Sequence, residues 1–247
     1  MVDYRKFRFH KLNTPEFSHL WLLLFWPIYG LAFAFLERGL PWLAGLFGHE
    51  ITYYAIWCPL DDRIPFCELF IIPYYLWFVF LAGMLLYSMF FEIPTFKKYM
   101  WFIIITYSIT CLVYAVFPNM QELRPQTAEE IGRDNFLVDI AFYLYDFDTN
   151  TNVCPSLHVI GSFAVFFAAW HSERFGKWYW RLIFGIFTIL ISISTVFLRQ
   201  HSVIDVFAGL AVCAVVYPLV YHWKPRKKKK SAEVEAKAEE KETISVS

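Results

Sequence analysis

The sequence predicts an all-α, polytopic membrane protein folded as a bundle of six transmembrane helices. Hydrophobic residues make up 58% of the 247-residue chain and charged residues only 18%, whereas a soluble domain is about 25% charged. The apolar residues also lie in long blocks, and one membrane-spanning helix needs about 20 of them. The net charge of zero offers no basic face, so nucleic acid is not an expected partner.

The expected spans follow from these apolar blocks. In chain order they are residues 20–36, 69–91, 100–117, the shorter 155–171, 182–198 and 203–221. Two further segments are predicted to lie in the membrane interface. One is 136–145, ten residues that include Asp139, and the other is 41–56, which contains Gly, His and Trp residues. Residues 1–223 therefore form one membrane domain.

The distribution of Lys and Arg predicts the orientation, because short cytoplasmic loops retain basic residues. With six spans and both termini in the cytoplasm, 17 of the 22 basic residues lie on the cytoplasmic side and 5 on the other. Residues 224–247, a basic run followed by mixed charges, are predicted to be a disordered cytoplasmic tail. The expected location is a bacterial cell membrane, with membrane lipids as neighbours and an oligomeric state that the sequence leaves open.

The five cysteines give no clear signal of a metal centre. They include no Cys-x-x-Cys pair, so a zinc or iron–sulfur site of the usual spacing is not indicated. Cys58, Cys67 and Cys154 lie on the predicted outer side, where either a disulfide between two of them or free thiols are compatible with the sequence.

Two polar clusters lie at the predicted outer ends of spans, where ionisable groups are costly and usually functional. In the first, Pro155 is expected in the first turn of a helix whose free N–H groups can bind phosphate. Ser156 adds a hydroxyl or caps the helix, and His158 lies on the same terminus. Arg124 is predicted to lie at the same outer membrane face as this cluster.

The second cluster is Arg199, Gln200 and His201, followed by Asp205. His201 and Asp205 are four residues apart and share one face of a helix, so the carboxylate can accept a hydrogen bond from one imidazole nitrogen. That bond leaves the other nitrogen oriented as a nucleophile or base. Opposite-running helices can bring the two clusters together.

These segments resemble the second and third motifs of the type 2 phosphatidic acid phosphatase superfamily, which has a membrane-embedded, acid-phosphatase-like core. Pro-Ser-x-His is matched at residues 155–158, and Ser-Arg-x5-His-x3-Asp is matched in part by Ser194, His201 and Asp205. Thr195 replaces the motif arginine, and Arg199 is a candidate substitute. The first motif is Lys-x6-Arg-Pro. Its Arg-Pro is matched at residues 124–125, but Phe117 occupies the lysine position. These departures are similar to those of the inositol-phosphorylceramide and sphingomyelin synthase branch.

The resemblance implies a lipid phosphatase that works without a cofactor or metal. His201 would form a phosphohistidine, Asp205 would hold its ring, and His158 would act as general acid and base. Arg124, Arg199 and Ser156 would bind the phosphoryl oxygens of a lipid phosphate at the exoplasmic face.

Three alternatives remain open. An alcohol could replace water as acceptor, which would make the protein a phosphotransferase that moves a phospho-headgroup between lipids. A non-catalytic lipid-binding or transport protein is disfavoured by the scarcity of ionisable residues in the other spans. A zinc hydrolase using Cys154, His158, His201 and Asp205 is the weakest alternative.

Overall fold

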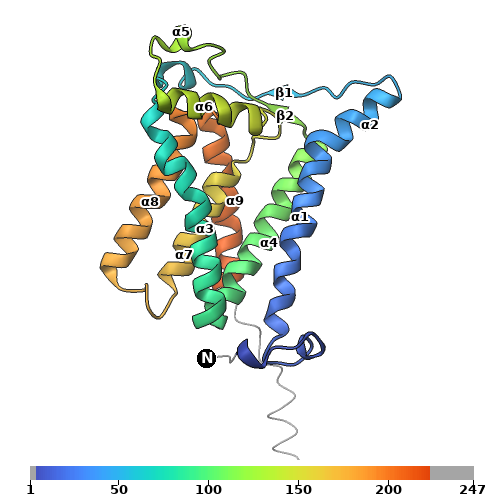
Figure 1. Ribbon diagram of the computed structural model, residues 1–247, viewed down its shortest axis with the longest axis vertical. Helices are drawn as coiled ribbons and strands as arrows, with labels where there is room; N and C mark the ends of the chain where they lie inside the picture. Colours follow the sequence, from blue (N-terminus) through green and yellow to red (C-terminus); the bar gives the residue numbers. More distant parts are fainter. Residues whose placement is uncertain (1–3, 223–247) are drawn as a thin grey trace, which may run out of the picture.

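The computed structural model describes residues 4–222 and shows a bundle of long helices with a cap of shorter elements at one end (Figure 1). The helices of the bundle are α1 (Phe25–Ala34), α2 (Leu40–Leu46), α3 (Ile71–Phe91), α4 (Ile93–Val116), α7 (Leu157–Trp170), α8 (Trp178–Phe197) and α9 (Val203–Tyr221). The predicted tail at 224–247 lies outside the described residues.

The all-α membrane architecture is confirmed. Within residues 4–222, five helical segments are long and apolar enough to cross a membrane: Ser18–Leu46, Glu68–Phe91, Ile93–Val116, Trp178–Phe197 and Val203–Tyr221. The remaining predicted span, α7, has 14 residues and is about 21 Å long, which is shorter than a bilayer core of about 30 Å. The count of six spans therefore stays a prediction.

The first helical segment is longer than predicted. It runs without a break from Ser18 to Leu46, so the first part of the segment at 41–56, predicted to be interfacial, instead continues the helix. One π-helical turn, Phe35–Gly39, joins α1 to α2. Pro41, the second residue of α2, follows this π-helical turn and does not end the helical segment.

Helices α4 and α7 also begin at residues other than those predicted. Helix α4 starts at Ile93 rather than at residue 100, and it includes Lys97 and Lys98, which the sequence favours as loop residues. Helix α7 starts at Leu157 with Ser156 as its N-cap, so Pro155 precedes the first turn instead of lying in it. Both differences arise because hydropathy locates the apolar part of a helix and not its capped ends.

The cap lies across the end of the bundle at which the two polar clusters are found. It contains α5 (Ala128–Ile131), α6 (Phe136–Phe147) and a parallel pair of short strands, β1 (Tyr54–Ala55) and β2 (Asn119–Met120). Helix α6 lies across the bundle axis in Figure 1, as expected for an interfacial helix. Its buried residues Ala141 and Leu144 pack with Tyr74 of α3 and with Leu198, which holds the cap on the bundle.

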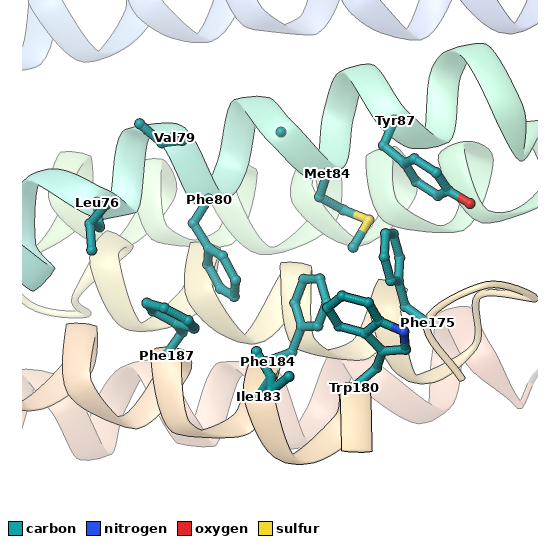
Figure 2. A pocket seen from close by; sticks show the side chains of 11 residues that line it. Leu76, Val79, Phe80, Met84, Tyr87, Phe175, Trp180, Ile183, Phe184 and Phe187 are labelled. Carbon is teal, nitrogen blue, oxygen red and sulfur yellow. The ribbon is translucent and has the colours of Figure 1, made fainter. Parts of the chain in front are cut away.

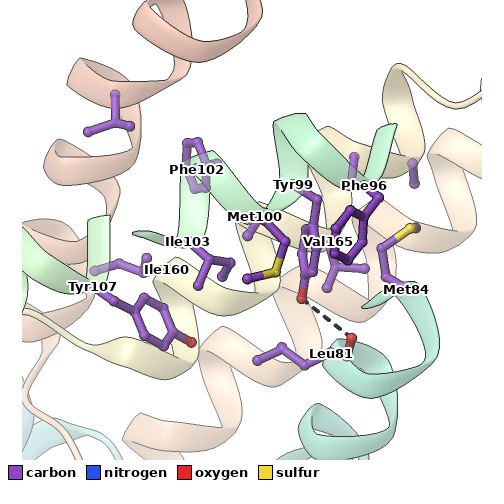
Figure 3. Close-up of a cluster of buried hydrophobic side chains, with 14 of the residues drawn as sticks. Leu81, Met84, Phe96, Tyr99, Met100, Phe102, Ile103, Tyr107, Ile160 and Val165 are labelled. Carbon is purple, nitrogen blue, oxygen red and sulfur yellow. Dashed lines mark hydrogen bonds between the residues drawn. The ribbon is translucent and has the colours of Figure 1, made fainter. Parts of the chain in front are cut away.

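The main core lies between α3, α4, α7 and α9. Figure 3 shows that it is rich in aromatic and sulfur-containing side chains, including Phe96, Tyr99, Met100 and Tyr107 of α4. Tyr99 is fully buried, and its hydroxyl donates to the Leu81 carbonyl oxygen at 3.4 Å. Small residues of α7 allow this close packing, because Ala164, Ala168 and Ala169 are all fully buried.

A second packing feature is an apolar cavity of about 310 Å³ between α3 and α8. Figure 2 shows the side chains that line it, among them Phe80 and Met84 of α3 and Phe184 and Phe187 of α8. Hydrocarbon and aromatic groups form nearly all of its wall, so the cavity is suited to apolar chains and carries no catalytic group.

At the end of the bundle opposite the cap, one carboxylate fastens two loops. Glu92 lies between α3 and α4 and accepts hydrogen bonds from the side chains of Tyr87, Thr95 and Ser172 at 2.7, 2.9 and 2.9 Å. It also accepts from the backbone N–H of Arg174 at 3.2 Å. Burial alone would raise the pKa of Glu92, but these hydrogen bonds hold it below its ordinary value.

We predict that Glu92→Gln lowers the melting temperature by roughly 5 °C, because the charged acceptor is lost from a loop junction that is only partly buried. Since the folded-state pKa is lowered, the stabilisation is fully present above the ordinary glutamate pKa of about 4.3 and disappears as the pH falls through the folded value. Thermal unfolding in detergent at pH 7 and at pH 3.5 tests this. Glu122→Gln, at an exposed residue of the cap, is the control, and an equal effect of both variants would contradict the prediction.

Candidate functional site

The two predicted polar clusters meet at the cap end of the bundle. His158 is in the first turn of α7, and His201 directly precedes the N-cap of α9. Their ring centroids are 5.7 Å apart, with an angle of 65° between the ring planes. Both side chains are more than nine-tenths buried. The opposite directions of successive helices thus bring together two imidazoles that are far apart in sequence.

Asp205 orients His201. The Nδ1 atom of His201 lies 3.1 Å from Oδ2 of Asp205, one turn further along α9. Because a buried carboxylate accepts hydrogen bonds, Nδ1 is assigned as the donor, and Nε2 keeps its lone pair. Asp205 is itself fully buried, which limits the orientations that the imidazole can adopt.

His158 is held by aromatic packing rather than by a carboxylate. Its ring centroid lies 4.4 Å from the ring centroids of both Tyr74 and Trp77 on α3. Within the described part of the chain, its buried Nδ1 atom has no hydrogen-bond partner. The two histidines are therefore not equivalent, because only His201 is fixed by a charged acceptor.

The start of α9 is built as a capping box. The Ser202 hydroxyl accepts from the Ile204 N–H at 3.2 Å, and Asp205 Oδ2 accepts from the Ser202 N–H at 3.0 Å. The Asp205 carboxylate oxygen that binds His201 is therefore the same one that caps the helix. The orientation of His201 is coupled to the formation of the first turn of α9.

Asp61 is a residue of this site that the sequence analysis did not identify. It lies in the segment between α2 and α3 and is 1% exposed. Its carboxylate accepts from the Ser202 hydroxyl at 2.6 Å, from the Val203 N–H at 2.8 Å and from the Cys58 N–H at 2.8 Å. Its sequence signal is an acidic pair at 61–62, followed directly by Arg63, and this pattern does not indicate its partner.

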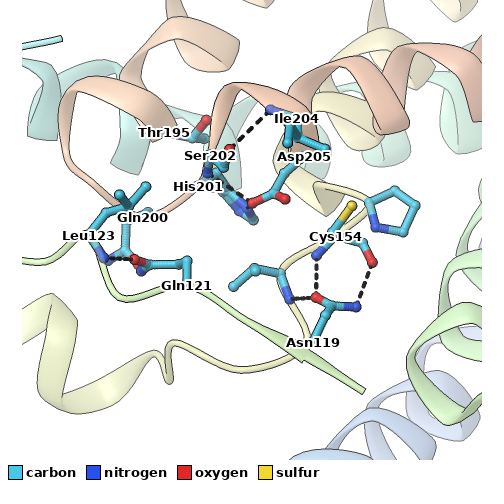
Figure 4. A network of polar contacts seen from close by, with 12 residues as sticks. Asn119, Gln121, Leu123, Cys154, Thr195, Gln200, His201, Ser202, Ile204 and Asp205 are labelled. Atoms are coloured by element: carbon cyan, nitrogen blue, oxygen red, sulfur yellow. Dashed lines mark hydrogen bonds and ion pairs between the residues drawn. The ribbon is translucent and has the colours of Figure 1, made fainter. Parts of the chain in front are cut away.

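The loop before α7 is fastened to the end of α4 by Asn119 (Figure 4). The Asn119 amide oxygen accepts from the N–H groups of Val153 and Cys154 at 2.9 and 2.8 Å, and its nitrogen donates to the Cys154 carbonyl at 2.9 Å. Burial, together with the adjacent Asp205 carboxylate, raises the pKa of Cys154 to about 12. The thiol is therefore protonated at neutral pH and is a poor nucleophile or metal ligand.

Ser156 is the N-cap residue of α7, but its side chain does not cap the helix. The residue is fully buried, and its hydroxyl has no partner among residues 4–222. Its backbone N–H donates to the Asp205 carbonyl oxygen at 3.1 Å, which ties the start of α7 to α9. The hydroxyl therefore remains available as a hydrogen-bond donor, two residues before His158 in the chain.

Arg124 lies directly behind the site. Its guanidinium donates to the carbonyl oxygens of Tyr145, Asp148 and Thr149 at 3.2, 2.7 and 2.8 Å, and also to Oε1 of Gln200. Burial lowers the pKa of Arg124, and the nearby Asp148 opposes that effect, so the group stays charged at neutral pH. Gln200 thus links this cation to the residue next to His201.

Arg199 points away from the histidines. It ends α8 in the left-handed conformation, with φ of +53°, and its guanidinium donates to the Ile64 carbonyl at 2.6 Å. It lines a separate outer cavity of about 600 Å³ together with Arg124 and Arg133. Thr195, at the motif-arginine position, is fully buried, and its hydroxyl bonds within α8 to the Ser192 carbonyl at 2.8 Å.

The histidines open into a cavity of about 340 Å³. Its polar end is lined by His158, His201, Gln200 and the carboxylates of Glu37 and Asp148. The rest of the lining, called the aromatic end below, is formed by residues of α1, α3 and α4: Trp26, Tyr29, Phe33, Tyr74, Trp77, Phe78, Tyr107 and Tyr114. Of these, Tyr74 and Trp77 lie against the His158 ring. The cavity therefore combines polar side chains with an extended aromatic wall.

The other candidate groups do not gather around this cavity. All five cysteines are unpaired, so no disulfide joins Cys58, Cys67 or Cys154. Within the described residues, no three His, Cys, Asp or Glu side chains are arranged to hold a metal ion.

The fold and site define a membrane-embedded helix bundle with a buried histidine pair and a carboxylate that orients one of them. A model of the PAP2 superfamily matches residues 98–229, more than half of the chain, and the chain belongs to that superfamily. Membership confirms the resemblance seen in the motifs and indicates a phosphatase or phosphotransferase activity on phosphate esters. No curated protein and no solved structure matches the chain.

We predict that Asp61→Ala destabilises the protein by about 3 kcal/mol, because it leaves buried donors at the start of α9 without an acceptor. Asp62→Ala, at the exposed neighbouring residue, should change the melting temperature little. Thermal unfolding of both variants in detergent checks this. If Asp61→Ala unfolds at the parental temperature, the proposed coupling between this loop and α9 is incorrect.

Proposed function

We propose that the protein is a lipid phosphate phosphatase that cleaves a lipid phosphomonoester or diphosphate through a phosphohistidine on His201. The observation that carries the proposal is the pairing of His201 with Asp205 opposite His158, with both rings on one cavity that has a polar and an aromatic end. The superfamily supplies the reaction class, and the arrangement of the side chains supports the assignment of each role.

In the first step, Nε2 of His201 attacks phosphorus while the bond from phosphorus to the lipid oxygen breaks. Asp205 stabilises the positive charge that the imidazole gains. His158 donates a proton to the departing alkoxide, which leaves as the lipid alcohol. The nucleophile must lie about 3 Å from phosphorus, and the acid about 3 Å from the leaving oxygen on the opposite side of phosphorus. The two imidazoles must therefore be several ångströms apart. The distance of 5.7 Å between their ring centroids agrees with this requirement.

In the second step, His158 takes a proton from water, and the water oxygen attacks the phosphohistidine. The bond from phosphorus to Nε2 then breaks, which releases inorganic phosphate and restores both imidazoles. The reaction balances without a redox step, and no cofactor is proposed.

Donors near the histidines would bind the phosphoryl oxygens. Gln200 Nε2 and the Ser156 hydroxyl are buried and lack a partner within residues 4–222, so both are suited to hydrogen-bond a phosphate. Arg124 would exchange its contact with Gln200 for one with the phosphate and supply positive charge. Arg199, in the outer cavity, would act at longer range by attracting the anionic headgroup.

We also propose that the site faces the exoplasmic side of a bacterial cell membrane and that both termini are cytoplasmic, as the distribution of basic residues predicts. Lipid phosphates of the outer leaflet would then enter with the phosphate at the polar end of the cavity. The chain would occupy the aromatic end.

A second candidate is a phosphotransferase that moves a phospho-headgroup onto a lipid alcohol. Two observations favour it. Phe117 and Thr195 replace the basic residues of the phosphatase motifs. In addition, Glu37 places a carboxylate in the cavity, where it accepts from the Thr149 hydroxyl at 2.5 Å and could receive the proton of an alcohol. The same His201 intermediate would serve both reactions.

We predict that His201→Ala lowers kcat/KM for release of phosphate from diacyl phosphatidate by at least about 1,000-fold, and that His158→Ala lowers it by about 100-fold or more. Phosphate is measured with purified protein in detergent, with and without added diacylglycerol or ceramide. Release that does not depend on an added alcohol supports the phosphatase, whereas label transfer to the alcohol without release supports the transferase.

His171→Ala is the matched control, because His171 lies at the opposite end of α7 and should not affect turnover. Parental turnover by correctly folded His201→Ala protein would show that the catalytic assignment is wrong.

We predict that Arg124→Ala lowers kcat/KM by about 100-fold, because this partly buried cation contacts Gln200 and is proposed to reach the phosphate. Arg199→Gly should lower it by about tenfold, mainly through KM, because the hydrogen bond that it loses to the Ile64 carbonyl lies away from the histidines and the substrate loses only long-range attraction. Glycine preserves the left-handed turn at this residue, where φ is +53°. Steady-state kinetics check both values, and Thr195→Ala should have little effect. A larger loss for Thr195→Ala than for Arg199→Gly would contradict the proposed role of Arg199.

A further inference from the structure

The aromatic end of the site cavity contains hydrogen-bond donors without acceptors. The Trp77 and Trp26 indole N–H groups and the Tyr29 and Tyr107 hydroxyls are all buried and have no partner in the described part of the chain. All four residues line the cavity that contains His158 and His201. Each unpaired donor costs about 1–3 kcal/mol, and a membrane interior offers no bulk water to satisfy it.

Tyr107 is the clearest case. It is 1% exposed, and it lies on α4 in the same core as Tyr99. Figure 3 shows the difference between the two: the Tyr99 hydroxyl is bonded to the Leu81 carbonyl, whereas the Tyr107 hydroxyl is not bonded to any residue drawn. Core packing alone would be served equally well by phenylalanine at residue 107.

Two of the donors converge on one point of α7. A Cβ atom added to Gly161 would lie 2.8 Å from the Tyr107 hydroxyl oxygen and 3.0 Å from Trp77 Nε1. Any larger side chain at residue 161 would therefore clash with both groups. The Tyr29 ring is next to them, with its centroid 5.0 Å from that of Tyr107. Donors from α3 and α4 thus meet over a glycine, and a tyrosine of α1 packs beside them.

This donor cluster lies about one helical turn, or roughly 5 Å, inward of the catalytic histidine on α7, because Gly161 follows His158 by three residues. The Trp77 side chain contacts both the donor cluster and His158, since its ring centroid is 4.4 Å from that of His158. A group bound by the cluster would therefore be attached to the substrate a few bonds away from the phosphate.

We propose that Tyr107, Trp77 and Tyr29 form a carbonyl-binding subsite that selects lipid phosphates with an acyl ester or amide next to the phosphate. The proposal rests on the phosphatase or transferase function above, which places the phosphate between the histidines. A carbonyl oxygen has two lone pairs, so it can accept hydrogen bonds from more than one of these hydroxyl and indole N–H donors at once. A prenyl or alkyl chain has only hydrocarbon at that level and would leave them unpaired.

The test compares lipids that differ only at this carbonyl. The substrates are diacyl phosphatidate, its dialkyl ether analogue with equal chain length, ceramide 1-phosphate and a polyprenyl phosphate. The proteins are the parental chain, Tyr107→Phe, Tyr29→Phe and the control Tyr99→Phe, which removes a hydroxyl from the same helix outside the cavity. Phosphate release gives kcat/KM, and native mass spectrometry of His201→Ala protein measures binding of the intact lipids.

We expect the parental protein to prefer diacyl phosphatidate or ceramide 1-phosphate over the ether lipid by at least about fivefold per hydrogen bond. Which of the two acylated lipids is preferred identifies the carbonyl as an ester or an amide. Tyr107→Phe and Tyr29→Phe should each reduce the acyl-to-ether ratio by about fivefold, and Tyr99→Phe should leave it unchanged. Tyr107→Phe should also raise the melting temperature of the lipid-free protein, because it removes an unpaired buried hydroxyl.

Equal use of ether and diacyl lipids by the parental protein would overturn the proposal. So would an unchanged acyl-to-ether ratio in both variants, or a polyprenyl phosphate turned over as well as the best acylated lipid. A separate outcome distinguishes the subsite from the reaction: no lipid releases phosphate, yet His201→Ala protein binds the diacyl lipid more tightly than the ether lipid. If Tyr107→Phe removes that difference in binding, the subsite is supported and the proposed reaction is wrong.

Discussion

The site depends on one carboxylate oxygen, Oδ2 of Asp205, which accepts from both the His201 imidazole and the Ser202 backbone N–H. The first contact orients the His201 imidazole, the proposed nucleophile, and the second closes the capping box of α9. Because both use the same atom, the imidazole cannot take its orientation unless the helix terminus is formed. Asp61 extends the arrangement to a distant loop by accepting from Ser202 and Val203. The His201 imidazole is therefore positioned by the folding of a helix end and not by a flexible loop.

A membrane imposes a second constraint, since buried backbone groups must find partners within the protein. The loops of this bundle meet that constraint through single polar side chains that each satisfy several groups. Asn119 accepts hydrogen bonds from the loop before α7, Glu92 accepts from the loop after α7, and Asp61 accepts from the start of α9. In contrast, four aromatic donors that line the site cavity, those of Trp26, Tyr29, Trp77 and Tyr107, have no partner among residues 4–222. This contrast supports a ligand-binding rather than a purely structural role for the cavity.

Much of the architecture could be predicted because hydropathy and helix periodicity are local properties. The sixth predicted span has the observed bounds of α9, and the pairing of His201 with Asp205 follows from a spacing of four residues on one helix. Helix ends were less predictable. Lys97 and Lys98 were expected in a loop but lie in α4, and residues 41–46 were expected at the interface but extend the first helix. Capping and neighbouring helices decide such boundaries, and neither is visible in hydropathy.

By itself, the sequence determined the fold class, the two histidines, Asp205 and the motif that places the chain in its superfamily, because these follow from composition and short spacings. Only the tertiary structure decided which cation contacts a residue of the histidine cavity. Arg199 is two residues from His201 but points to another cavity, because the left-handed turn at the end of α8 directs it towards Ile64. Arg124 is distant in sequence but reaches Gln200. Asp61, Trp77 and Tyr107 likewise join the site only because helix packing brings remote residues to one cavity, and no local pattern encodes that packing.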